Sequence, residues 1–209
     1  MKNLTTTSYA MLGLLAQTPS SAYELAKKME QSIRGFWPRA QSKLYEEPQN
    51  LVVHGLAEAR QAYQGRRPMV IYAITPMGQE ALRAWLSVPG AGPVLEFEAL
   101  LKVFFADQGS KEDLLLQINA MKHWAEETQR AGRHFLEGYA RMEVAEADLL
   151  PGLGLMSAFL MSHAAVVAGW ADWAAREVES WPGFGRAAPT RRIFAELLKR
   201  ASGDKPQLE

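Results

Sequence analysis

The chain has 209 residues, of which 48% are hydrophobic and 22% are charged, as expected for a globular protein of one or two domains. It contains no cysteine, which excludes disulfides, zinc–thiolate sites and thiol catalysis and suits a reducing cytoplasm. The formal net charge of zero, taken alone, argues against a protein that binds nucleic acid. The halves differ, however: residues 1–86 hold ten Lys and Arg against six Asp and Glu, a net +4, and the rest is −4. This asymmetry favours a basic module joined to an acidic domain.

Two helices are predicted at the start of the chain, where no apolar run follows a basic start and no signal peptide is therefore expected. Residues 5–16 are apolar on most sides, which indicates a largely buried helix. Ser21 and Glu24 then have the spacing of a capping box, which begins a second helix. That helix carries two basic residues that are candidates for phosphate contacts, Lys27 and Lys28.

A third helix is predicted from about residue 39 to residue 54. Pro48 lies inside this range, removes a backbone donor and crowds the preceding turn, so we expect a kink or an early break near Glu47. The first turn presents side chains that hydrogen-bond base edges and phosphates, at the helix end that enters a major groove. These candidate DNA-binding residues are Arg39, Gln41, Ser42 and Lys43.

A basic hairpin follows, because residues 56–60 and 69–74 are strand-like and the polar segment between them contains Gly65, which forces a turn. Side chains at the tip can reach a phosphate ridge or enter a minor groove. The candidates there are Tyr63, Gln64, Arg66 and Arg67. A solvated turn that is basic by chance is the alternative reading of the hairpin alone.

The hairpin leads into a helix over residues 76–86, which Thr75 can cap and Pro76 can begin. We expect it to bury Leu82, Trp85 and Leu86. This order of helices and hairpin is the plan of a winged-helix DNA-binding module. The competing hypothesis is a helical interaction protein whose winged helix binds a protein, which an apolar patch in place of the basic face would favour.

The first 86 residues resemble the PadR-type transcriptional regulators in four local patterns, which keep the order and spacing of that family. The patterns are Tyr9-Ala10-Met11-Leu12-Gly13-Leu14-Leu15, Ser21-Ala22-Tyr23-Glu24-Leu25, Leu44-Tyr45 followed by Leu51 and Gly55-Leu56, and Tyr72-Ala73-Ile74-Thr75-Pro76-Met77-Gly78. Pro48 departs from the leucine of many relatives. The start of the second half also resembles the longer subclass, which adds a helical dimerisation domain. The resemblance implies a homodimeric regulator, usually a repressor, that binds a palindromic operator and often releases it on meeting a small aromatic or drug-like molecule.

The second half is predicted to contain a helix over residues 94–106 and, after a cap at Ser110, a very long helix to Leu150, about 60 Å at 1.5 Å per residue. A heptad seam runs along it and is apolar at eight of eleven positions. The seam residues are Leu114, Ile118, Met121, Ala125, Thr128, Gly132, Phe135, Tyr139, Met142, Glu146 and Leu149.

A helix this long needs a partner, and we expect the seam to be shared between two. One is a second copy of the chain, with dimerisation through Ile118, Met121, Phe135, Tyr139, Met142 and Leu149. The other is an intramolecular antiparallel bundle with residues 155–179. Gly132 and Gly138 are expected to mark a close crossing or a bend. The apolar stretch 155–171 is shorter than the roughly 20 residues of a membrane span and is expected to be a buried helix.

No catalytic motif is found, since the four histidines are scattered and no HExxH, Walker or nucleophile-elbow pattern occurs. We therefore expect neither an enzyme nor a bound metal or cofactor. Tryptophans at helical spacing are usually core residues, and they also suit a pocket for a small aromatic effector. The weak candidates for such a pocket are Trp37, Trp124 and Trp173.

The sequence thus predicts a mainly α protein with an N-terminal winged helix-turn-helix, made of three helices and a two-stranded wing, and an all-helical dimerisation domain. The predicted boundaries are residues 1–87 for the winged helix, 88–93 for a Gly- and Pro-rich linker, 94–201 for the helical domain and 202–209 for a flexible tail. The predicted function is that of a cytoplasmic homodimeric repressor that binds double-stranded operator DNA.

Overall fold

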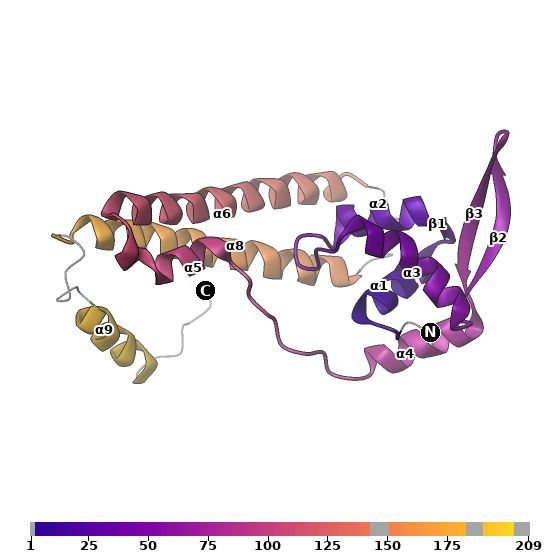
Figure 1. The fold of residues 1–209 in the computed structure, drawn as a ribbon, viewed down its shortest axis with the longest axis horizontal. Coiled ribbons are helices and arrows are strands. Elements are labelled where there is room, and N and C mark those ends of the chain that lie inside the picture. Colours follow the sequence, from indigo (N-terminus) through magenta and orange to yellow (C-terminus); the bar gives the residue numbers. More distant parts are fainter. Residues whose placement is uncertain (1–2, 143–150, 183–189, 203–209) are drawn as a thin grey trace. The chain divides into compact units, whose positions relative to one another are not determined.

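The computed structural model describes residues 3–142, 151–182 and 190–202. The chain divides into two compact units, residues 1–93 and 94–209, each described by itself below. The elements of the first unit are α1 (Thr6–Gln17), β1 (Ser20–Ser21), α2 (Ala22–Ser32), α3 (Gln41–Val53), β2 (Ala57–Gln64), β3 (Arg67–Ile74) and α4 (Pro76–Leu86) (Figure 1). Those of the second are α5 (Glu98–Phe104), the short 3-10 helix η1 (Ala106–Gln108), α6 (Lys111–Ala140), α8 (Pro151–Glu179) and α9 (Thr190–Ser202).

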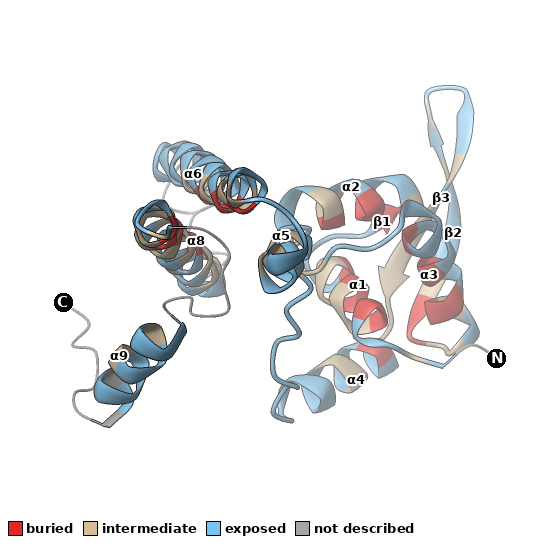
Figure 2. Ribbon diagram, turned by 60° about the vertical axis from the view of Figure 1, so that its left-hand side comes forward, coloured by how far each residue is buried: buried red, intermediate tan, exposed pale blue. Residues whose placement is uncertain are grey.

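The core of the first unit lies where α1, α2 and α3 meet, as the buried segments of these helices show in Figure 2. Its members are apolar residues at helical spacing, which burial drives inward. The buried ones are Met11, Leu12, Leu15, Leu25, Ala26, Met29, Leu44, Leu51, Leu56 and Ala57. Helices α1 to α3 and the β2–β3 hairpin confirm the predicted winged-helix fold.

The predicted capping box at the start of α2 is present. The backbone N–H of Ser21 donates to Oε2 of Glu24 over 2.7 Å, and the N–H of Glu24 donates to the Ser21 hydroxyl over 3.2 Å. These donors, the backbone N–H first, hold the pKa of Glu24 below its ordinary value. Ser20 and Ser21 also form β1, which pairs with Tyr72 and Ile71 and adds a third strand that the sequence did not predict. A two-residue strand is too short for its periodicity to be recognised.

Helix α3 runs through Pro48 without a break, so the predicted early end near Glu47 is wrong. The Pro48 ring is fully buried, and burial of its apolar surface offsets the lost backbone hydrogen bond. Glu47, only 3% exposed, fastens the same turn to α1. Its Oε1 accepts hydrogen bonds from the Ser8 hydroxyl and, over 3.0 Å, from Nδ2 of Asn50.

The wing is longer than predicted, because the β2–β3 pairing continues outward to Gln64 and Arg67. Only Gly65 and Arg66 remain for the turn. Gly65 has φ 63°, which the first central residue of such a two-residue turn requires and which glycine adopts without steric cost. Sequence reasoning placed the turn correctly and took the outer strand residues for loop, since they are polar on both faces of the hairpin.

Helix α4 has the predicted bounds and its Thr75 cap, whose Oγ1 accepts from the N–H of Gly78 over 3.0 Å. The prediction that it buries three side chains is wrong for two of them. Leu82 packs against the core, but Trp85 is half exposed and Leu86 is 67% exposed. Trp85 lies at the outer edge of the core instead, with its ring stacked on Tyr9 at 5.2 Å.

The second unit is built on α6 and α8, which pack side by side in antiparallel directions (Figure 1). Lys122 Nζ of α6 donates to Oδ1 of Asp172 over 2.6 Å, and ten residues farther along α6 a Cβ added to Gly132 would lie 3.1 Å from Met161. Gly132 therefore marks the predicted close crossing. An added Cβ at Gly138 would meet nothing within 4 Å, so Gly138 marks none.

Helix α6 ends at Ala140, ten residues before the predicted end. Its 30 residues span about 45 Å at 1.5 Å per residue rather than 60 Å. The N–H of Arg141 turns back to the carbonyl of Gly138, which closes the helix with a tighter turn. Two predicted seam residues, Glu146 and Leu149, lie outside the described residues. The predicted first helix of this unit is also shorter, since α5 begins only at Glu98.

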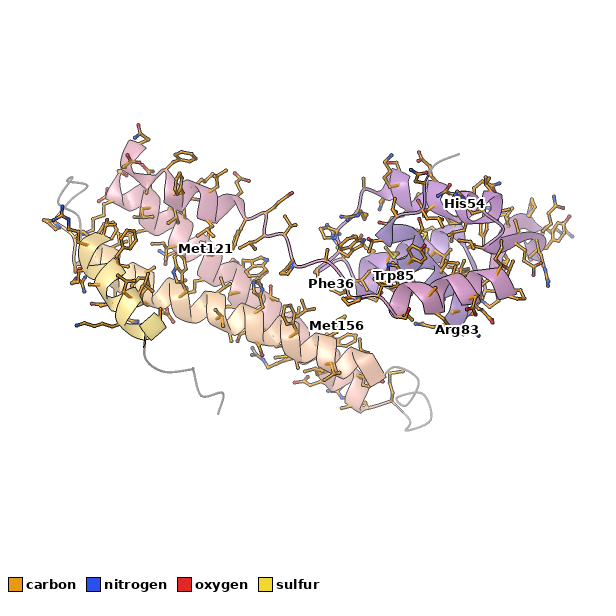
Figure 3. The ribbon with its side chains drawn as sticks, turned by 90° about the horizontal axis from the view of Figure 1, so that it is seen from below. Phe36, His54, Arg83, Trp85, Met121 and Met156 are labelled. Carbon is orange, nitrogen blue, oxygen red and sulfur yellow. The ribbon has the colours of Figure 1, made fainter. Side chains whose placement is uncertain are left out.

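The predicted seam is used within one chain along its first half. Leu114, Ile118, Met121 and Ala125 are buried (Met121 is labelled in Figure 3), and the first two share a core cluster with Ala171, Ala174 and Val178 of α8. Ile118 and Met121 are therefore intramolecular packing residues, and their assignment to dimerisation is corrected. Phe135 and Met142 are exposed, and Tyr139 is half buried.

Helix α8 is not the buried helix that was predicted, because only one side of it is covered. Ser157, Ala164 and Ala171 are buried, whereas Leu155, Phe159 and Val166 are 79%, 67% and 70% exposed. Among the described residues, 152–179 form a helix that is long and apolar enough to cross a membrane, by length and composition alone. Asp172 within this helix forms an ion pair with Lys122 of α6.

Candidate nucleic-acid interface

The start of α3 presents a polar, basic surface. Gln41, Ser42 and Lys43 form its exposed first turn, as predicted. Ala40 occupies the N-cap position and has no side-chain oxygen with which to cap the helix. The first N–H groups of α3 and the positive end of its dipole therefore remain directed at an approaching anion such as a phosphate.

Arg39, just before α3, is held in place by the first unit. Its guanidinium lies over the Trp37 ring at 4.0 Å, its Nε donates to Oγ1 of Thr7 over 3.3 Å, and its Nη1 donates to the Pro38 carbonyl over 2.6 Å. Trp37 itself donates from Nε1 to the same Thr7 oxygen over 3.2 Å. This arrangement gives Trp37 a positioning role beside Arg39, and it does not support the prediction that Trp37 binds an effector.

The exposed side of α3 contains two further residues, Tyr45 and Gln49, that sequence reasoning did not select. They follow Ser42 at spacings of three and seven, which puts all three on one side of the helix. The signal was present in the sequence, since buried Leu44 and Leu51 define the opposite side. A small cleft of about 340 Å³ adjoins this surface, lined by Glu30, Arg34, Pro38, Arg39, Ala40 and Gln41.

The two lysines predicted on α2 differ in their surroundings. Lys27 is exposed, as a phosphate contact requires. Lys28 is half buried, and its Nζ donates to the Ser20 hydroxyl over 2.9 Å. Lys28 thus connects α2 to the short strand β1, which gives it a structural use in addition to the one predicted.

The wing tip keeps its predicted basic character, with Arg66 and Arg67 exposed and Tyr63 exposed beside them. The side chain of Gln64 lies outside the described residues, although its backbone pairs with that of Arg67. Farther down the wing, Arg60 is paired with Glu58 on its own strand, which reduces its availability to a phosphate. The basic charge of the wing is therefore concentrated at its tip.

Residues 11–84 match a family described as the transcriptional regulator PadR-like family. The N-terminal unit is a PadR-like domain. This match confirms the resemblance seen in the sequence, and the helical second unit agrees with the longer subclass. The family consists of transcriptional regulators, which agrees with the lack of a catalytic motif in the sequence.

Two curated relatives align with about half of the chain. One is the negative transcriptional regulator PadR of Bacillus subtilis, 28% identical over 107 residues that make up 50% of this chain and 59% of that protein. The other is a probable transcriptional regulator of Mycobacterium tuberculosis, 27% identical over 125 residues, or 54% of this chain and 66% of that protein. The chain thus spans about three fifths to two thirds of the length of these relatives.

Solved structures of Bacillus subtilis PadR share the fold over most of the chain. The complex with operator DNA has a TM-score of 0.71 at 21% identity, covering 83% of this chain and 99% of that one. The complex with p-coumaric acid has a TM-score of 0.66 at 19% identity, covering 83% and 96%. At these identities the likeness establishes the fold of the chain. Its ligands have to be inferred from its own residues.

Proposed function

We propose that this protein is a transcriptional regulator that binds DNA in a sequence-specific manner and acts as a homodimeric repressor at a palindromic operator. The observation that carries the proposal is the first turn of α3, where exposed polar and basic side chains lie beside an arginine fixed on Trp37. Such a turn, in a PadR-like domain, suits entry into a major groove. A cytoplasmic location belongs to the same proposal.

The proposed roles follow from side-chain chemistry and exposure. Gln41 and Ser42 read base edges, because their amide and hydroxyl groups both donate and accept hydrogen bonds. Arg39, Lys43 and Lys27 position the helix through phosphates. The wing residues Arg66 and Arg67 bind the adjacent backbone or minor groove, with Tyr63 and Gln64 beside them.

Salt dependence of DNA binding tests this assignment. We expect the protein to bind DNA from upstream of its own coding region more tightly than random DNA, in fluorescence anisotropy across a salt series. Arg66→Ala should weaken binding to both DNAs and reduce the slope of log K against log salt by about one, since one phosphate contact is lost. The matched control is Arg83→Ala, which removes an exposed arginine that pairs with Glu80 on α4.

An unchanged salt slope in Arg66→Ala would show that the wing does not contact a phosphate. If neither DNA is bound, or both are bound equally weakly, sequence-specific DNA binding is rejected for the upstream site. A protein partner for the winged helix would then become the better explanation of its exposed surface.

The proposed homodimer is supported by an exposed apolar side of α8. Leu155, Phe159 and Val166, separated by four and seven residues, lie on the side of the helix opposite buried Ser157 and Ala164. A helix that is apolar on two opposite sides needs two neighbours to cover it. Helix α6 is one of them, and we propose that the second copy of the chain supplies the other. Phe135 and Tyr139 on α6, and Met142 just beyond its end, extend the proposed interface.

Charge placed on the outer side of α8 tests the dimer. The wild-type protein should sediment at about twice the 23.2 kDa of one chain. Phe159→Glu combined with Val166→Glu should give a monomer, because two carboxylates would be buried in an apolar contact. Glu179→Gln, at the end of α8, is the control and should remain dimeric. A wild-type monomer, or a dimer that survives both charges, would contradict the proposal.

Release by a small aromatic effector completes the proposed function. The p-coumaric acid complex of Bacillus subtilis PadR supports it by its fold likeness alone. Within this chain Trp37 of the first unit lies against Arg39, and Trp124 of the second unit packs edge-on against His163. Trp173 lines a cavity of the second unit.

A further inference from the structure

A cavity of about 640 Å³ lies within the second unit, a volume typical of sites for drug-sized ligands. It is bounded by α5, η1, α6, α8 and the start of α9. Three tryptophans, Trp170, Trp173 and Trp181, line it together with Phe104. The remaining apolar lining comes from residues such as Leu114, Ile118 and Val178, which belong to the core of this unit.

Two of the described lining residues are charged, Asp107 from η1 and Glu177 from α8, and both are acidic. The Glu177 side chain is only 10% exposed. Its Oε1 accepts from Nη2 of Arg192 and, over 3.2 Å, from Nε1 of Trp181. These donors, Arg192 first, hold the pKa of Glu177 below its ordinary value, so the group carries its negative charge at neutral pH.

Glu177 pairs with a cation of the same chain, Arg192, beside the cavity. Arg192 comes from α9, fifteen residues along the chain, and its guanidinium pairs with Glu177, the carboxylate that also accepts from Trp181. Indole faces attract cations, and a buried carboxylate strengthens that preference. Arg192 offsets the charge of Glu177, so Asp107, Glu177 and Arg192 together leave one net negative charge at the cavity, which disfavours an anion such as an aromatic acid. The cavity therefore combines an apolar body with an anionic rim.

We infer that this cavity is the effector site of the protein and that it takes a small apolar cation, in which aromatic or aliphatic groups surround a positive charge. The apolar part contacts the tryptophans, and the charge pairs with Asp107, beside the Glu177–Arg192 ion pair. The inference deepens the proposed function, and it rests on that function only for the step from ligand binding to release of DNA.

Two ions of matched shape test the inference. Tetraphenylphosphonium and tetraphenylborate have four phenyl rings each and opposite charges, and their binding to the full-length protein is measured by calorimetry without DNA. We expect the cation to bind at least tenfold more tightly than the anion. Glu177→Gln and Asp107→Asn should each weaken cation binding several-fold, whereas the control Glu179→Gln, two residues beyond Glu177 on α8, should not.

The outcomes test separately the charge of the ligand, the location of its site and its role as an effector. Equal binding of the two ions overturns the cationic class, and cation binding that neither Glu177→Gln nor Asp107→Asn weakens overturns the site. Asp107→Asn keeps the test decisive if loss of the Arg192 partner in Glu177→Gln loosens α9. Finally, the cation is added to a complex with upstream DNA. Release supports the effector role, and retention of DNA despite cation binding overturns that role. Because the binding test contains no DNA, failure of DNA recognition leaves its result intact.

Discussion

Replacing Gly78 by alanine is expected to lower the free energy of unfolding of the first unit by about 3 kcal/mol, the upper part of the range for overpacked sites. An added Cβ would lie 2.1 Å from the carbonyl oxygen of Leu56 and 2.9 Å from Cγ1 of Ile74. The Leu56 oxygen has little freedom to move, since it accepts from the N–H of Thr75 over 3.0 Å. Thr75 Oγ1 also donates to the Gly55 carbonyl over 2.7 Å. The clash therefore affects the junction of α3, the wing and α4 together.

Urea unfolding followed by circular dichroism measures this effect, and Gly13→Ala is the matched control. Gly13 also lies in a helix of the same unit, but an added Cβ there would meet nothing within 4 Å. Alanine at that position should raise stability by about 0.5 to 1 kcal/mol, because it restricts the unfolded chain. Wild-type stability in Gly78→Ala would show that the backbone of this junction adapts at little cost.

Local features of the first unit were predictable because short-range chemistry determines them. The Ser21–Glu24 capping box, the Thr75 cap of α4 and the turn at Gly65 each involve residues a few positions apart, and the sequence shows them directly. The PadR-like patterns place these features in order. Helix bounds then follow to within one to three residues for α1, α2 and α4.

Features that depend on distant contacts were not predictable from spacing. Trp37 was assigned to an effector pocket, because nothing near it in sequence shows that Thr7, thirty positions away, accepts its N–H. Glu177 was not selected, since its partner Arg192 belongs to a helix that the sequence reading did not separate. The outward apolar side of α8 was also missed, because an apolar composition gives no indication of how many neighbours cover a helix.

The seam of α6 shows why a heptad pattern does not reveal which helix packs against it. Leu114, Ile118, Met121 and Ala125 have the heptad spacing of a dimer interface, yet all four are buried within one chain, in which α6 packs against α8. Heptad spacing states only that one side of a helix is buried, and an intramolecular helix satisfies it as well as a second copy. Exposure separates the two cases, and it moves the proposed dimer contact to α8 and the end of α6.

Truncating Glu47 to alanine is expected to cost about 3 kcal/mol of unfolding free energy, because two effects add. A cavity is left at a site that is only 3% exposed, and the Ser8 hydroxyl and the Asn50 amide lose a buried acceptor. Glu46→Ala, at the exposed neighbouring position, is the control and should change stability by about 0.5 kcal/mol or less.

A double-mutant cycle separates the hydrogen bond from the cavity. Ser8→Ala alone removes the donor and leaves Glu47 in place, and the double variant removes both partners. We expect a coupling of about 1 to 2 kcal/mol between the two positions, since they meet directly across α1 and α3. Strict additivity would show that Glu47 stabilises α3 by filling space alone. Coupling would instead show that the buried Ser8–Glu47 contact itself stabilises the packing of the proline-containing helix on α1.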